Sequence, residues 1–89
     1  MTTSTLTYNG WANHATWNVS LYINNEYSFY QAACDYVQFC MDHNVTPTYS
    51  NFVEEHHYLL GDITPDGVSW NNPTLNQEEL DEFIQEFGQ

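Results

Sequence analysis

Apolar positions along the chain repeat at spacings of three and four residues in four segments, a pattern typical of α-helices with one buried face. The clearest repeat lies in residues 26–41, for which we predict the main core helix. Its apolar stripe consists of Tyr30, Ala33, Cys34, Val37, Cys40 and Met41. We expect Asn44 to end this helix, because asparagine tolerates the left-handed backbone conformation.

Two further helices are predicted on either side of this one. The earlier helix should begin after Asn13, a good N-cap, and reach Ile23, just before an Asn-Asn pair. The later helix should cover residues 49–60, between a Thr-Pro-Thr turn and Gly61, a typical helix C-terminal residue. We expect its inward side chains to be Phe52, Val53, His56, Leu59 and Leu60.

The last helix is predicted to begin at Thr74 or Asn76 and to end at Gly88. Asn76 and Glu79 resemble a capping box, in which each side chain accepts from the other's backbone N–H. The apolar stripe of this helix is Leu80, Phe83, Ile84 and Phe87.

Residues 62–73 show no helical spacing. They contain Pro-Asp-Gly at positions 65–67, a strong turn signal. We expect an irregular segment pinned by Trp70. The whole pattern predicts an all-α fold, a single domain over residues 1–89 of about four short helices, with a flexible tail at residues 1–7.

Charge changes this picture more than any motif does. The chain has 12 Asp and Glu residues, no Lys and no Arg, and a formal net charge of -12. Such a field disfavours direct binding to nucleic acid or to anionic membranes, and it attracts proteins with basic surfaces. We therefore expect the partner to be a basic, nucleic-acid-binding protein.

Composition indicates a folded domain, since 42% of the residues are hydrophobic and 17% are aromatic. No segment approaches the roughly 20 apolar residues that span a bilayer, and the N-terminus resembles no signal peptide. Cys34 and Cys40 on one helix would lie about 9 Å apart along its axis, too far for a disulfide. These features predict a soluble protein in the cytoplasm of the host cell.

Two groups of carboxylates are candidate partner-binding sites. On a helical wheel the last helix places five of them opposite its apolar stripe, where we expect all five to face solvent. These five are Glu78, Glu79, Asp81, Glu82 and Glu86. A second, looser group surrounds the end of the preceding helix and the turn after it. Its members are Glu54, Glu55, Asp62 and Asp66. The two groups merge into one patch only if these helices pack side by side.

A zinc-binding site is an alternative interpretation of the sequence. Cys40 and His43 share a helix face if the helix continues, and His56 with His57 would complete four ligands. The pattern is weak, because it has no paired Cys-x-x-Cys and Cys40 belongs to the apolar stripe. We expect neither metal nor cofactor. Without Lys or Arg, the chain also has no cation other than histidine to stabilise an anionic intermediate, so we expect no enzymatic activity.

The N-terminal stretch from Tyr8 to Leu21, YNGWANHATWNVSL, combines two tryptophans with fixed polar positions. It resembles the N-G-W-x-N-x-x-T-W-N-x-x-L pattern of small, largely uncharacterised proteins of phages and other mobile elements. That resemblance implies a mobile-element origin and no particular activity. We interpret the motif as structural, with Gly10 in a turn, Asn13 as the helix cap and Trp11 and Trp17 as anchors.

In size and charge the chain also resembles acidic anti-restriction and anti-CRISPR inhibitors that mimic DNA. What this resemblance implies is the leading hypothesis: a phage-encoded acidic inhibitor that mimics nucleic acid and blocks the basic nucleic-acid-binding surface of a host defence protein. The partner would then be a nuclease, CRISPR effector or restriction enzyme of the host. An alternative is a non-enzymatic interaction module for a basic host transcription or nucleoid protein. A small zinc-binding domain is a third.

Overall fold

The computed structural model describes residues 10–88, so the expected tail at residues 1–7 lies outside it. Its helices are α1 (His14–Asn25), α2 (Tyr27–Asp42), α3 (Tyr49–Glu55), α4 (His57–Leu60) and α5 (Gln77–Gln85), followed by the 3₁₀ turn η2 (Glu86–Gly88). The described residues form no strand, only one isolated antiparallel bridge between Ile63 and Ser69. The all-α prediction is confirmed.

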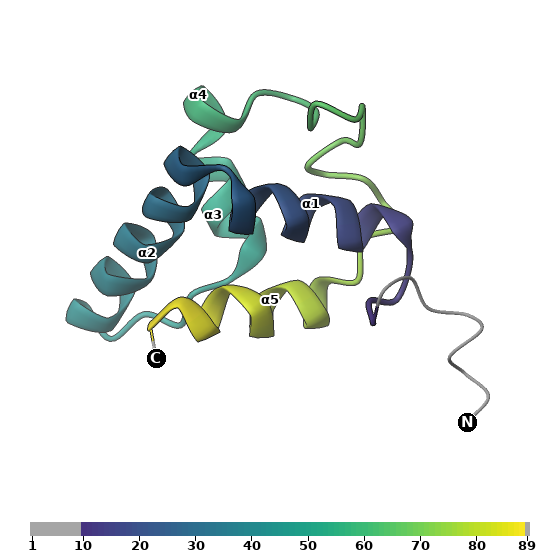
Figure 1. Cartoon of the computed structure of the whole chain (residues 1–89). Helices are drawn as coiled ribbons and strands as arrows, with labels where there is room; N and C mark the ends of the chain where they lie inside the picture. The colour runs from purple at the N-terminus through teal and green to yellow at the C-terminus, as the bar shows by residue number, and fades with distance from the viewer. Residues whose placement is uncertain (1–9, 89) are drawn as a thin grey trace.

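The helices enclose one core. α1 and α5 run in the same direction, one above the other, and α2 crosses their C-terminal ends (Figure 1). The fully buried side chains between them come from every part of the chain. They include Val19, Ile23, Ala33, Phe52, Leu80 and Ile84. No helix in residues 10–88 has the length and apolar character needed to span a bilayer.

The start of α1 forms as the sequence predicts. Gly10 has a φ of 90°, a conformation that favours glycine. The Asn13 side chain accepts hydrogen bonds from Thr16 N at 2.9 Å and Thr16 Oγ1 at 2.7 Å, so it caps the helix. The helix continues two residues past the predicted end at Ile23, and Glu26, with extended backbone, separates it from α2.

The buried face of α2 differs from the predicted stripe. Tyr36 is buried, whereas Tyr30 and Met41 are 42% and 52% exposed. The difference arises because the Tyr36 hydroxyl accepts a hydrogen bond from Thr48 N at 3.3 Å and its ring lies against Phe52. A tyrosine whose polar end has a partner can be buried. The buried face of α2 therefore includes Tyr36, whose ring contacts Phe52 of α3. Asn44, with a φ of 57°, follows the helix as predicted.

The helix predicted over residues 49–60 is two helices. Thr48 caps α3, and Gly61, with a φ of 74°, follows α4, as expected. The break falls at His56, whose backbone leaves the helical region at φ −114° and ψ 20°. Its Nδ1 lies 2.8 Å from Phe52 O, where it can donate a hydrogen bond. Such a side-chain bond to the preceding turn competes with the regular helix ladder.

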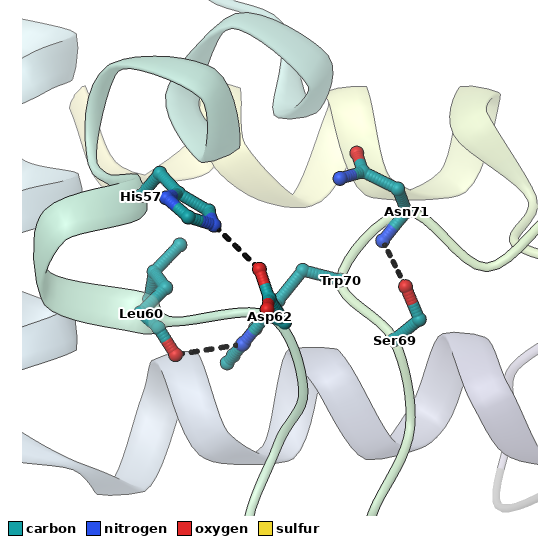
Figure 2. A network of polar contacts seen from close by, with 6 residues as sticks. All are labelled: His57, Leu60, Asp62, Ser69, Trp70 and Asn71. Atoms are coloured by element: carbon teal, nitrogen blue, oxygen red, sulfur yellow. Dashed lines mark hydrogen bonds and ion pairs between the residues drawn. The ribbon is translucent and has the colours of Figure 1, made fainter.

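The segment between α4 and α5 is irregular, as predicted, and Trp70 holds it. Trp70 is 1% exposed, and its Nε1 donates to Leu60 O at 3.0 Å (Figure 2). The Tyr49 hydroxyl donates to Trp70 O at 2.8 Å, and burial raises the pKa of that hydroxyl well above its ordinary value. The predicted turn forms at Gly67, whose N–H donates to Thr64 O at 2.8 Å.

Candidate functional site

One face of α5 carries a row of exposed carboxylates. Glu78, Glu82 and Glu86 are exposed, and none of their side chains makes a hydrogen bond or ion pair with another described residue. Glu78 lies in the first turn, where the helix dipole favours a negative charge. Glu82 and Glu86 lie toward the other end, where the dipole disfavours it. Each also has a like charge four residues before it, which is destabilising.

The other two carboxylates of α5 do not face solvent freely, which corrects the expectation that all five do so. Glu79 and Asp81 are half-buried. Glu79 Oε1 accepts a hydrogen bond from Ala12 N at 2.9 Å, and Asp81 Oδ1 accepts one from Tyr49 N at 2.8 Å. Glu79 therefore fixes the segment before α1, while Asp81 satisfies a free N–H in the first turn of α3. Asn76 caps α5 as expected, but the reciprocal bond of a capping box is replaced by the bond to Ala12.

A groove runs beside the acidic row. It consists of two adjoining hollows of about 390 Å³ and 250 Å³, which share Asn24, Phe83 and Glu86. We call it the α5 groove. The remaining residues that line it are Gly10, Trp11, Tyr30, Glu79, Glu82 and Phe87. Two of its walls are therefore chemically different, since one supplies carboxylates and the other aromatic rings.

Four aromatic rings of the groove contact one another in a continuous chain. The Trp11 and Phe83 ring centroids lie 5.5 Å apart, those of Phe83 and Phe87 5.2 Å apart, and those of Phe87 and Tyr30 5.3 Å apart. All three pairs are edge-to-face, the arrangement that aromatic quadrupoles favour. The chain joins the segment before α1, α5 with η2, and α2. It holds these rings in place although none of the four is fully buried.

The loop carboxylates of the second acidic group are bound to the protein itself. Asp66 Oδ2 accepts from Asn18 Nδ2 at 2.8 Å, and Asn18 Oδ1 accepts from Thr64 Oγ1 at 2.7 Å. Partial burial and the negative charge of Asp66 raise the pKa of the nearby Tyr22 hydroxyl. Asp62 Oδ1 lies 2.7 Å from His57 Nε2, in an exposed pair (Figure 2).

The helical members of that group, Glu54 and Glu55, are exposed and make no ion pair with another described residue. Glu54 lines an open hollow of about 490 Å³ together with Ser50, Val53, His57 and Asn71. The sequence left open whether the two acidic groups form one patch; α3 does pack against α5, but the loop carboxylates lie apart from α5. Residues 62–67 lie along the upper edge of Figure 1, above α1, and α5 lies below α1.

The alternative zinc set is not assembled. Cys40 is buried in the core, while His43 Nδ1 and His56 Nδ1 lie 2.9 Å and 2.8 Å from backbone carbonyls of their own helices. His57 instead contacts Asp62. Within residues 10–88, no group of three or more His, Cys, Asp and Glu side chains could hold a metal ion.

Sequence reasoning missed the aromatic wall of the groove. Helical spacing predicts core positions for Phe83, Phe87 and Tyr30. The N-terminal motif predicts a structural anchor at Trp11. The signal that could have found them is their position: Phe83 and Phe87 each directly follow a glutamate of the acidic row. Neighbours on a helix lie 100° apart, so a ring at the edge of the core face reaches the carboxylates beside it.

Comparison with known proteins identifies the family but gives no activity. The chain belongs to a family of unknown function (DUF7249), whose model matches residues 4–89. No curated protein matches the chain, and no solved structure does. Any function must therefore be argued from the acidic row and the α5 groove.

Proposed function

We propose that the protein is a phage-encoded acidic inhibitor that mimics nucleic acid and blocks the basic nucleic-acid-binding surface of a host defence protein. The target would be a CRISPR effector or a restriction enzyme in the host cytoplasm, and inhibition would need no cofactor and no catalytic step. The observation that carries the proposal is the unpaired acidic row on α5 in a chain that has neither lysine nor arginine.

The spacing of the row supports mimicry. Four helical residues rise about 6 Å, so Glu78, Glu82 and Glu86 present three charges over about 12 Å. One strand of duplex DNA carries a phosphate about every 3.4 Å along its axis, so alternate phosphates are separated by about 7 Å in the axial direction. The long side chains of lysine and arginine can adjust to the small difference. A groove that binds phosphates could therefore accept this helix face.

The energetics of the row also support an external partner. Glu82 and Glu86 repel each other, oppose the helix dipole and make no bond to another described residue. Their charges therefore lower the stability of the isolated protein. Departures from good local chemistry are expected where a protein functions. A basic surface would supply the missing counter-charges.

The alternative is an interaction module for a basic transcription or nucleoid protein of the host. It would use the same acidic row, and the two functions differ in the identity of the target. A defence target predicts that the protein protects an invading phage, whereas a transcription or nucleoid target predicts altered gene expression without protection.

The test measures protection in a bacterium that carries an active CRISPR or restriction system. Cells that express the protein should be infected by a targeted phage far more efficiently than cells that express the Glu78→Gln, Glu82→Gln, Glu86→Gln variant. The variant keeps side-chain size and helix propensity, so the fold should survive. The matched control is Glu26→Gln with Asp35→Asn and Asp42→Asn, which removes three exposed charges on α2 and at its N-cap, outside both acidic groups, and should protect as well as wild type does.

A biochemical assay completes the test. With the purified defence nuclease, the protein should compete with DNA, and the competition should weaken steeply between low and moderate salt. Direct binding of the isolated protein to duplex DNA at physiological salt would contradict mimicry. So would equal protection by wild type and the triple glutamine variant.

A further inference from the structure

The α5 groove cannot be filled by an ion pair from the protein's own long basic side chains, because the chain has none. A second copy could not supply one either. The groove carboxylates Glu82 and Glu86 and the rings Trp11 and Phe83 therefore form a site for which no lysine or arginine of this chain, or of a second copy, can supply the complementary charge. This separates the groove from an ordinary apolar groove, which could be covered by many kinds of surface.

We propose that the α5 groove seats an arginine side chain of the partner protein, with its guanidinium between the carboxylates and the aromatic rings. This inference rests on the proposed function, because it names the contact through which the acidic row recognises a basic surface. The carboxylates Glu82 and Glu86 would accept the guanidinium N–H groups. Trp11 and Phe83 would contact its planar surface.

Arginine fits this site better than lysine does. Its guanidinium is planar, it donates in a fork that matches carboxylates, and it is weakly hydrated, so it stacks on aromatic rings. A lysine ammonium is a compact and strongly hydrated charge that satisfies the carboxylates without using the rings. A purely charged surface would treat the two residues alike, whereas the groove should discriminate between them.

The edge-to-face chain supports this assignment because it orients the rings before any partner arrives. Trp11 contacts Phe83, which contacts Phe87, and Ala12 N is bonded to Glu79 beside them. Gly88, the last residue of η2, lies so close to α2 that a Cβ there would come within 2.7 Å of Val37 Cγ1. The walls of the groove are therefore fixed by close packing, which reduces the entropy lost on binding.

The test uses two peptides of equal charge, tetra-arginine amide and tetra-lysine amide, titrated against the ¹⁵N-labelled full chain. Wild type should bind tetra-arginine about 2- to 5-fold more tightly, the size expected for a partly exposed cation–π contact. The indole N–H signal of Trp11, assigned with Trp11→Phe, should shift with tetra-arginine. The signal of Trp70, which is 1% exposed, should not.

Phe83→Leu should remove the preference for arginine while leaving the affinity for tetra-lysine unchanged. The matched control is Phe39→Leu, the same substitution at a 52% exposed ring on α2 outside the groove. If Phe83→Leu does not fold, the Trp11 shift in wild type decides. Equal affinity for the two peptides in wild type, no binding of either, or no Trp11 shift would overturn the inference.

The two proposals can fail separately. If a defence nuclease is inhibited through the acidic row but Phe83→Leu inhibits as well as Phe39→Leu does, the groove inference is wrong and the proposed function stands. If the groove selects tetra-arginine but no phage is protected, the proposed function is wrong and the site must serve another basic protein.

Discussion

Asp66, in the loop after α4, and Glu82, on α5, are both exposed carboxylates of a chain without lysine or arginine, yet their surroundings differ. Asp66 accepts a hydrogen bond from the buried Asn18 at 2.8 Å. Glu82 has no partner among the described residues and lies beside Phe83 at the mouth of a groove. One carboxylate is part of the polar network that holds the loop to α1. The other contributes only its charge.

These two residues show how a chain without lysine or arginine can keep a stable fold. The carboxylates that lie near backbone or amide N–H groups accept hydrogen bonds, and this replaces salt bridges: Glu79 bonds to Ala12, and Asp81 to Tyr49. Like Asp66, these residues stabilise contacts between segments far apart in the sequence. The carboxylates of the acidic row, like those of Glu54 and Glu55, make no such bond with another described residue. Net charge alone does not separate the two classes.

The largest loss of stability is expected from a substitution in the loop between α4 and α5. Replacing Trp70 by alanine should lower the free energy of unfolding by about 3–5 kcal/mol, because a fully buried ring and its bond to Leu60 O are lost. Chemical denaturation measures this. The matched change Trp11→Ala removes a half-buried ring and should cost clearly less. If the two substitutions lowered the free energy of unfolding equally, Trp11 in the groove would be as closely packed as Trp70 in the core. The expected difference between the groove and the core would then be wrong.

The second prediction concerns the polar network. Asn18→Ala should cost about 1–3 kcal/mol, because Asn18 is fully buried and bonds to both Thr64 and Asp66. Asp66→Ala should cost less, about 0.5–1.5 kcal/mol, since water can reach the amide that it leaves unpaired. Glu82→Ala should change stability by no more than about 0.5 kcal/mol. The losses in the free energy of unfolding, measured by urea denaturation, should be largest for Asn18→Ala, smaller for Asp66→Ala and smallest for Glu82→Ala.

Local contacts could be predicted from the sequence, whereas contacts between distant segments could not. Helix starts were predictable at Asn13, Thr48 and Asn76, because capping is local: a side chain bonds to an N–H three residues away. The bonds of Glu79 and Asp81 span 67 and 32 residues. No local pattern signals such contacts: the sequence suggested only a capping box for Glu79 and no partner for Asp81.

Tyr36 and His56 show the second source of error. The burial of Tyr36 goes with a hydrogen bond from Thr48 N to its hydroxyl, and the non-helical backbone of His56 goes with the contact of its Nδ1 to Phe52 O. Helical periodicity predicts neither contact. Periodicity correctly placed Glu78, Glu82 and Glu86 on the exposed side of α5, although it placed Glu79 and Asp81 there as well. The groove was not predictable, because its aromatic wall is assembled from segments on both sides of the core.

Removing charge from α5 should change stability least of all these substitutions, and the sign of the change should be opposite to that in the loop. Glu82→Gln with Glu86→Gln should raise the free energy of unfolding by a few tenths of a kcal/mol at low salt, since it removes like-charge pairs four residues apart and charges that oppose the helix dipole. The gain should vanish in about 1 M sodium chloride, where the Debye length is about 3 Å. Asp66→Ala, which removes one charge from the loop, should destabilise at both salt concentrations, because a hydrogen bond rather than a long-range charge is lost. If the double variant were also destabilised at both concentrations, Glu82 or Glu86 would have an internal partner, and the acidic row would belong to the fold.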